Sequence, residues 1–347
     1  MNFDSKEMHA LALKVLSVLQ QEVSDPDGRS HLTMERWEWP SGVALYGIFK
    51  TYEKTGDKQA LDYLAAWYDR ELKKPAPHRN VNTVGPMLAL VCLYEITREE
   101  AYLPHILSWA DWVMHQMPRT EFEGLQHITV WNKHYQQLWA DTLFMAVLFL
   151  LKAGLVLDRR DWVEEAKFQF LLHIKYLQDR RTGLWVHGWT FDCRHDFAGA
   201  HWARGNSWFT AAGAEILSLL PEEDAATRMI RVSLEDQVRA LWKYQRESGL
   251  YTTLVDVEEC YEETSATAGI AFGILKLTRL RILPETYRDM AEQAAAAVIG
   301  KIAPDGTVMG VSNGTGMGRD LEHYKKIPLC PTAYGQGLTF LMLTELM

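Results

Sequence analysis

Apolar residues recur at helical spacing along almost the entire chain, and this spacing limits the fold more than any other feature of the sequence. In one stretch, Leu61, Leu64 and Tyr68 fall at i, i+3 and i+7, which puts all three on one face of an amphipathic helix. The same pattern returns at 163–177 and 226–241. Each of these helices is expected to bury one side and to expose the other.

A second kind of segment is apolar most of the way round the helix. The segments with this character are 138–154, 206–220, 264–280 and 333–347. A helix without a polar face must be surrounded by protein. The buried helices alternate along the chain with the half-buried ones, and short turns join several of the pairs, which is typical of antiparallel helix hairpins.

Helix start and stop patterns predict twelve helices in total. Their expected ranges are 4–22, 41–55, 57–73, 83–97, 99–116, 138–154, 159–178, 205–220, 222–245, 264–280, 284–301 and 333–346. Six irregular hairpins follow from this order, each entered through a segment that joins polar or aromatic residues to Gly, Ala or Ser.

Six hairpins laid side by side, with their buried helices inside, close a ring. The predicted fold is therefore all-α: an (α/α)6 barrel of six inner and six outer helices, with residues 1–347 forming a single domain. The alternative is an open helical solenoid, but its inner helices would then line an exposed apolar face. In the closed ring all six entry segments meet at one end, where the inner helices present free N–H groups. The functional mouth is expected at that end.

Charge and composition narrow the class of protein. The 347 residues carry a formal net charge of −9 and no long basic run, which argues against a nucleic-acid partner. No stretch reaches about 18 uncharged apolar residues, and the first residues lack a secretory pattern, so no membrane partner is expected. The four cysteines are scattered, which favours a reducing compartment, the cytoplasm. Motifs for metal ions and nucleotides are missing, so neither a metal nor a cofactor is expected.

Asp141 is an isolated ionisable group at the start of an otherwise apolar helix, two residues after Trp139. Two interpretations are open. The side chain is either a helix cap, the commonest role of Asp at this position, or a desolvated carboxyl whose raised pKa lets it hold a proton near neutral pH. The second interpretation makes Asp141 a candidate general acid.

Arg204 lies between Trp202 and Trp208 in the segment HWARGNSW. A planar guanidinium beside aromatic rings suits bidentate binding of a carboxylate, while the rings stack on a sugar. The alternative is an Arg that lies across Trp at the surface. His187, in LWVHGW, is likewise either a structural histidine beside a Trp or a residue that binds a ligand.

The segments WEWPSG, NVNTVGP, LWADTLFM, LWVHGW, WARGNSW, EETSATAG and AYGQG occur in this order from about residue 30 to the end of the chain. Together they resemble glycoside hydrolase family 105, the unsaturated rhamnogalacturonyl hydrolases, which is related to the unsaturated glucuronyl hydrolases of family 88. The resemblance implies that the barrel is a catalytic domain. It also implies a small oligosaccharide substrate, made by a polysaccharide lyase, that ends in a 4,5-unsaturated uronic acid and is of the rhamnogalacturonan type.

The resemblance also implies roles for individual residues. Asp141 becomes the general acid and base that protonates C4 of the substrate's enol ether and then assists water at C5. The implied sugar-binding residues are Trp39, Asn82, His187, Trp202, Arg204 and Trp208, with Arg204 expected to bind the substrate carboxylate. Asn82 departs from the family pattern, in which Asp is common at this position. Three explanations are open: Asp141 suffices in this subgroup, the activity is reduced, or the substrate differs. The first is favoured, because hydration of an enol ether does not need two spaced carboxylates.

Three other functions stay open at this point. One is an ordinary glycosidase that pairs Asp141 with Glu262 or Glu263, another is a His-based sugar epimerase, and the third is a non-catalytic carbohydrate-binding protein. The loops expected to form the subsite for the sugar behind the scissile bond are 117–135, 190–200 and 303–330.

Overall fold

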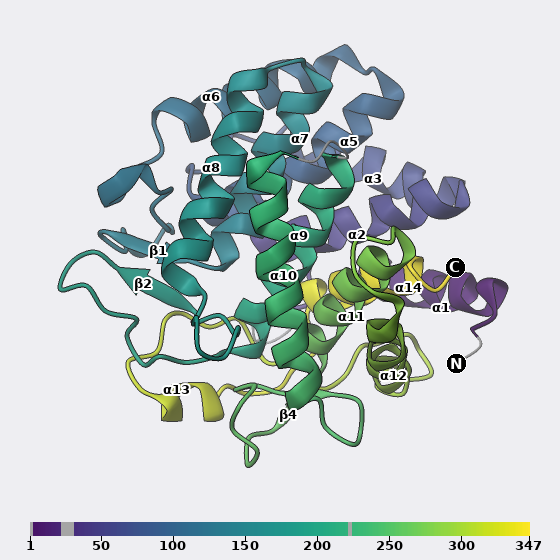
Figure 1. Cartoon of the computed structure of the whole chain (residues 1–347). Helices are drawn as coiled ribbons and strands as arrows, with labels where there is room; N and C mark the ends of the chain where they lie inside the picture. The colour runs from purple at the N-terminus through teal and green to yellow at the C-terminus, as the bar shows by residue number, and fades with distance from the viewer. Residues whose placement is uncertain (1–2, 22–30, 221–223) are drawn as a thin grey trace.

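All twelve predicted helices are present in the computed structural model, which describes residues 3–21, 31–220 and 224–347 (Figure 1). The expected helix ends at residues 22 and 222 lie outside the described residues. The inner helices are α2 (Trp39–Thr55), α5 (Met87–Thr97), α7 (Leu148–Val156), α9 (Ala203–Leu219), α11 (Thr264–Arg279) and α14 (Ala333–Thr344). The outer helices are α1 (Ser5–Gln20), α3 (Lys58–Glu71), α6 (Leu103–His115), α8 (Arg160–Leu177), α10 (Ala225–Tyr244) and α12 (Arg288–Ile299).

The ring of inner helices closes where the last of them, α14, packs against the first, α2. Two glycines let the two backbones touch. A Cβ on Gly47 would lie 2.6 Å from the carbonyl oxygen of Gly337, and a Cβ on Gly337 would lie 2.7 Å from the amide nitrogen of Ala44. Side chains at these two positions would separate the helices. The open solenoid is therefore wrong for this chain, and the all-α (α/α)6 barrel is confirmed.

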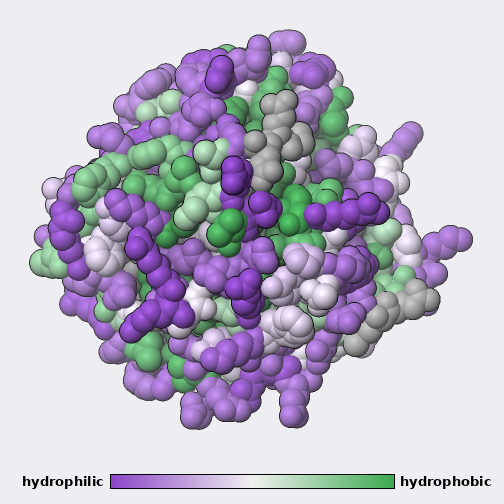
Figure 2. Space-filling model, viewed as in Figure 1, coloured by the Kyte–Doolittle hydropathy of each residue, from purple (hydrophilic) through white to green (hydrophobic). Residues whose placement is uncertain are grey.

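Burial separates the two layers as the apolar patterns predict. In α9 every residue from Ala203 to Leu217 is buried, whereas α10 buries one side, which includes Ile230, Leu234 and Leu241. The outer helices turn their polar sides to solvent, and hydrophilic residues cover most of the face shown in Figure 2. Among the described residues, no helix has the length and apolar character needed to cross a bilayer.

One predicted inner helix, 83–97, is interrupted. Its residues are divided between α4 (Val81–Val84) and α5 because Pro86 has no N–H to donate to a helical hydrogen bond. The strand pairs that the helical patterns did not predict are β1 (Gln137–Trp139) with β2 (Gly188–Thr190), and β3 (Tyr251–Thr252) with β4 (Glu262–Glu263). The other short elements are η1 (Glu100–Tyr102), η2 (Glu121–Glu123), η3 (Leu143–Val147), η4 (Glu285–Tyr287) and α13 (Leu321–Lys325).

Several of these short elements gather at the end of the barrel where the inner helices begin. Figure 1 shows β1 and β2 at the left of the molecule, and α13 and β4 in its lower part. The helix expected at 138–154 therefore starts later in the chain than predicted. Its first two residues belong to β1, and the π-helical segment η3 precedes α7. The residues that could take part in catalysis or binding lie at this end, which is the mouth of the barrel.

Candidate active site

Asp141 lies at the mouth, between β1 and η3. Its side chain is 17% exposed, and its Oδ2 atom is buried without a hydrogen-bond partner among the described residues. No side-chain cap hydrogen bond closes the start of η3, so the helix-cap interpretation gains no support. Segments of π-helix are frequently found at functional sites. The carboxyl is largely buried but still reachable, as a general acid has to be.

His187 faces Asp141 from the residue before β2. The Nε2 atom of His187 lies 3.4 Å from the Oδ2 atom of Asp141. On the other side of the ring, Nδ1 forms a 2.8 Å hydrogen bond with the hydroxyl of Tyr324, and this hydroxyl accepts a hydrogen bond from the backbone N–H of Gly318. These contacts fix the orientation of the imidazole. Tyr324 lies in α13, where no pattern in the sequence singled it out.

Aromatic rings enclose the pair. Trp139 stacks on His127, with ring centroids 4.1 Å apart and planes 7° from parallel. The ring centroid of His187 lies 5.1 Å from that of Trp139 and 4.2 Å from that of Trp202. His127 was missed by the sequence reasoning. Its Nδ1 atom lies 3.0 Å from the hydroxyl of Thr142. Burial lowers the pKa of His127 to about 3, so this ring is neutral near pH 7.

Opposing effects set the pKa of Asp141. Burial raises it, whereas the neighbouring imidazoles of His187 and His127 lower it, and the net result lies below the ordinary value. The expectation of a raised pKa is therefore wrong for the protein without substrate. The apolar flanks in the sequence indicated the burial correctly, but they could not show which imidazoles the fold brings to the carboxyl.

Arg204 is 1% exposed and holds a loop. Its Nη1 group donates to the backbone carbonyl and the hydroxyl of Ser312, at 2.8 and 2.6 Å, and its Nη2 group donates to the carbonyl of Asn313. The guanidinium also lies over the rings of Trp202 and Tyr334. Most of its donors are thus committed to the protein, and the surface interpretation is wrong. Binding of a substrate carboxylate by Arg204 stays a prediction. The Nε atom is a donor left for such a ligand, because it has no hydrogen-bond partner among the described residues.

A cavity of about 520 Å³ lies at the mouth and is lined by Trp39 and Asn82. Trp39 stacks on Tyr334, with ring centroids 4.5 Å apart. Trp208 is fully buried and packs edge-on against Trp39 at 6.3 Å, so it supports the wall of the cavity and does not form it. Trp131, which is 93% exposed, also lines the cavity.

A glycine-rich loop, 312–318, links this cavity to the Asp141 cluster. A Cβ on Gly314 would lie 3.4 Å from the ring of Trp39, and a Cβ on Gly316 would lie 3.9 Å from the ring of Trp139. The loop therefore contacts both aromatic walls of the mouth. Arg204 holds one end of it, and the hydroxyl of Tyr324 holds the other.

The glutamates at the mouth differ in what they can do. Glu263 is fully buried and accepts hydrogen bonds from the hydroxyl of Ser265 and the N–H groups of Ala266 and Ser312, so it is a structural cap for α11 and for the loop. Glu38 lines the 520 Å³ cavity, and burial raises its pKa while a hydrogen bond with Asn82 opposes that effect. Glu38 was not singled out from the sequence.

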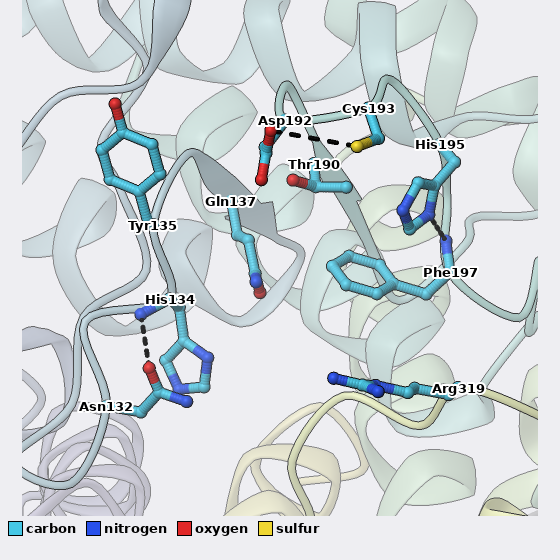
Figure 3. Close-up of a pocket in the computed structure, with 10 residues that line it drawn as sticks. All are labelled: Asn132, His134, Tyr135, Gln137, Thr190, Asp192, Cys193, His195, Phe197 and Arg319. Atoms are coloured by element: carbon cyan, nitrogen blue, oxygen red, sulfur yellow. Dashed lines mark hydrogen bonds between the residues drawn. The ribbon is translucent and has the colours of Figure 1, made fainter.

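A second cavity, of about 490 Å³, opens beside β1 and β2 (Figure 3). The residues around it are Asn132, His134, Tyr135, Gln137, Thr190, Asp192, Cys193, His195, Phe197 and Arg319. Asp141 is absent from the linings of both cavities. Trp139, two residues before Asp141, contacts the lining of the 490 Å³ cavity, because its indole N–H donates a 2.9 Å hydrogen bond to Gln137. Within the described residues, no three His, Cys, Asp or Glu side chains form a group that could hold a metal ion.

The structure thus divides the residues predicted from the sequence into three groups. Asp141, His187 and Trp202 lie together; Trp39 and Asn82 line the 520 Å³ cavity; Arg204 and Trp208 are buried behind the walls.

This fold and this mouth define a glycoside hydrolase built on an (α/α)6 barrel. The model of Glycosyl Hydrolase Family 88 matches residues 17–347, and the chain belongs to this family. It is 35% identical over 315 residues to the unsaturated rhamnogalacturonyl hydrolase YesR of Bacillus subtilis, and the match covers 90% of each protein. The resemblance found in the sequence motifs is therefore confirmed.

Solved structures agree with this assignment. A possible member of the GH105 family from Salmonella enterica is 44% identical to this chain, with a TM-score of 0.94, and the match covers 99% of this chain and 94% of that one. The unsaturated glucuronyl hydrolase from Bacillus sp. GL1 has a TM-score of 0.75 and 18% identity, and the match covers 98% and 96% of the two chains. At that level of identity the likeness concerns the fold alone.

Proposed function

We propose that this glycoside hydrolase removes a 4,5-unsaturated uronic acid from the non-reducing end of lyase-generated oligosaccharides, with a rhamnogalacturonan-type disaccharide as its substrate. Family membership and the name of the Bacillus subtilis relative support this substrate class. The observation that carries the proposal is the placement of a reachable carboxyl, Asp141, against an imidazole in an aromatic enclosure at the mouth. In this proposal the barrel is one catalytic domain.

The reaction in this proposal is hydration of an enol ether. Asp141 gives its proton to C4 of the C4=C5 bond, and the positive charge that forms at C5 is shared with the ring oxygen. The carboxylate of Asp141 then accepts a proton from the water that adds to C5. The product is a hemiketal, which opens and releases the neighbouring sugar. One carboxyl performs both proton transfers, so Asn82 is not required to act as an acid.

The lowered pKa of Asp141 means that the carboxyl is ionised at neutral pH before substrate binds. Substrate displaces water from the mouth and brings its own carboxylate, and both changes raise the pKa of Asp141. In the proposed cycle Asp141 therefore takes up its proton once the substrate is bound and passes it to C4.

The remaining predicted residues bind or support the sugar. Trp39 offers a ring face, and Asn82 offers amide hydrogen bonds in the 520 Å³ cavity. Trp202 holds His187 by ring contact. Trp208 keeps Trp39 in place, and Arg204 keeps the loop 312–318 in place.

The competing glycosidase finds less support in the structure. Glu263 accepts four hydrogen bonds that cap α11 and the loop. Glu262, the other residue of β4, accepts a hydrogen bond from the hydroxyl of Ser248. Neither carboxylate lines either of the two cavities at the mouth. The four cysteines are all free thiols, which supports the proposal that the protein works in the cytoplasm.

The test is Asp141→Asn, assayed by loss of the ultraviolet absorbance of the enol ether in a lyase-derived disaccharide. We expect turnover to fall at least about 100-fold while the fold and sugar binding persist. Asp161→Asn, at an exposed carboxylate on α8, is the matched control. Unchanged turnover in Asp141→Asn would remove Asp141 from the mechanism, and equal turnover of a saturated uronide would favour an ordinary glycosidase. The non-catalytic alternative requires that the wild-type protein leaves the absorbance unchanged.

A further inference from the structure

The 490 Å³ cavity beside β1 and β2 takes no part in the reaction proposed above, yet its walls come from separate parts of the chain. Residues from 132–135, from 190–197 and Arg319 converge on it. These are parts of the three loops that the sequence analysis expects around the sugar behind the scissile bond. A cavity of this volume is in the ordinary range for a small-molecule site.

Arg319 lines this cavity and carries a permanent positive charge. It is exposed, and its guanidinium forms no hydrogen bond or ion pair with the part of the chain that the structure describes. Figure 3 shows its side chain extending toward the middle of the ring of labelled residues. Arg194, on the neighbouring loop, is different, because it donates to Glu121 at 2.7 Å. A free guanidinium with a fork of N–H donors suits a carboxylate.

The other walls suit the body of a sugar. Phe197 and Tyr135 offer ring faces, and the side chains of Gln137 and Thr190 offer polar groups. Asp192 is also in the lining, and it forms no ion pair with Arg319. A carboxylate on one wall can accept hydrogen bonds from sugar hydroxyls while a guanidinium elsewhere binds an anionic group.

Both sides of the cavity are connected to the catalytic pair. On one side, Gln137 accepts the indole hydrogen bond of Trp139, whose ring lies 5.1 Å from that of His187. On the other side, Arg319 follows Gly318, whose N–H donates to Tyr324 at 3.1 Å. A saccharide whose terminal residue is at Asp141 therefore has this cavity next to it.

We propose that the 490 Å³ cavity binds the saccharide on the reducing side of the scissile bond, and that Arg319 binds a carboxylate of that saccharide. This inference rests on the proposed function and specifies its substrate. Beyond the disaccharide, the preferred substrates are longer acidic oligosaccharides that carry a further uronic acid on the reducing side of the scissile bond.

The test compares two lyase-derived substrates of equal length, one with a uronic acid and one with a neutral sugar on the reducing side. We expect the wild-type protein to show the higher kcat/KM for the acidic substrate, through a lower KM. In Arg319→Gln the ratio of the two kcat/KM values should fall at least about fivefold. Arg319→Lys should keep part of the preference, and Arg194→Gln should keep the wild-type ratio. The same ratio in wild type and Arg319→Gln would overturn the inference, as would a preference for an amino sugar that depends on Asp192.

A binding measurement separates this inference from the reaction itself. Calorimetry with the Asp141→Asn variant and the acidic substrate should show weaker binding when Arg319→Gln is added. If the wild-type protein turns over neither substrate but the binding difference persists, the proposed reaction fails and the acidic subsite stands. If binding is unaffected while both substrates are turned over, the subsite fails and the reaction stands.

Discussion

The Nε2 atom of His187 lies 3.4 Å from the Oδ2 atom of Asp141, and neither atom has a hydrogen-bond partner among the described residues. Tyr324 holds the opposite nitrogen of the imidazole at 2.8 Å, so the ring cannot turn away without losing that bond. At this separation the imidazole lowers the pKa of the carboxyl, against the effect of burial. The proton affinity of Asp141 therefore depends on His187 as well as on burial.

Replacing His187 with Gln should change the pH dependence of the reaction. In the variant, burial of Asp141 is no longer opposed by His187, so the pKa of the carboxyl should rise from its lowered value. The protonated carboxyl that gives its proton to C4 then persists to higher pH. The alkaline limb of the kcat/KM profile should consequently move to higher pH, while loss of the imidazole that faces Asp141 should lower the maximal kcat/KM about tenfold or more.

Kinetics between pH 4 and pH 9 would check this prediction, together with a direct NMR titration of the Asp141 carboxyl. His115→Gln, at the exposed end of α6, is the control for replacing an imidazole with an amide. An alkaline limb that stays in place in His187→Gln would show that His187 does not lower the pKa of Asp141.

Glu215 offers a test of a buried charge far from the chemistry. It is 2% exposed in α9 and forms an ion pair with the Nζ atom of Lys276 at 2.8 Å. Burial alone would raise its pKa, but the charges of Lys276 and Lys50 prevail and lower it from the usual 4.5 to about 2. Glu215→Gln leaves Lys276 without its counter-charge, so the free energy of unfolding should fall by about 3–5 kcal/mol at pH 7.

The sign of the pH effect follows from the lowered pKa. The carboxylate contributes stability fully above pH 4.5 and loses it as the pH falls toward 2. The difference between wild type and Glu215→Gln in urea unfolding should therefore be largest at pH 7 and shrink at pH 3. Glu164→Gln, at an exposed carboxylate of α8, is the control. A difference that is the same at both pH values would mean that Glu215 acts through packing and not through its charge.

The contact between Gly47 and Gly337 makes closure of the barrel testable. A Cβ on Gly337 would lie 2.7 Å from the backbone of Ala44, so Gly337→Ala should push α14 away from α2. We expect a loss of about 1–3 kcal/mol in the free energy of unfolding, measured by urea denaturation. Gly316→Ala is the control, because its nearest neighbour would lie 3.9 Å away. Equal stability of wild type and Gly337→Ala would contradict the close approach of the two helices.

The sequence predicts the helices well because their apolar spacing is a local property. It predicts the site less completely, because the side chains that decide the chemistry come from segments without periodic patterns. Tyr324 and His127 lie in irregular parts of the mouth, and neither has a neighbour in the sequence that points to a role. Arg204 shows the same limit. Its eight-residue motif indicates a special environment, but its hydrogen-bond acceptors at Ser312 and Asn313 are 108 and 109 residues away along the chain.

Arg204→Lys would separate the two roles open to this residue. A lysine keeps the positive charge but cannot donate at once to the carbonyls of Ser312 and Asn313 as the guanidinium does. The loop 312–318 should loosen, with faster amide hydrogen exchange at Gly316 and its neighbours and a fall in kcat/KM of about tenfold. Arg279→Lys, which replaces an arginine paired with Glu345 away from the mouth, should leave both properties as they are. If activity falls while exchange in the loop stays at the wild-type rate, Arg204 acts on the substrate itself, and the carboxylate-binding role predicted from the sequence would replace the loop-holding one.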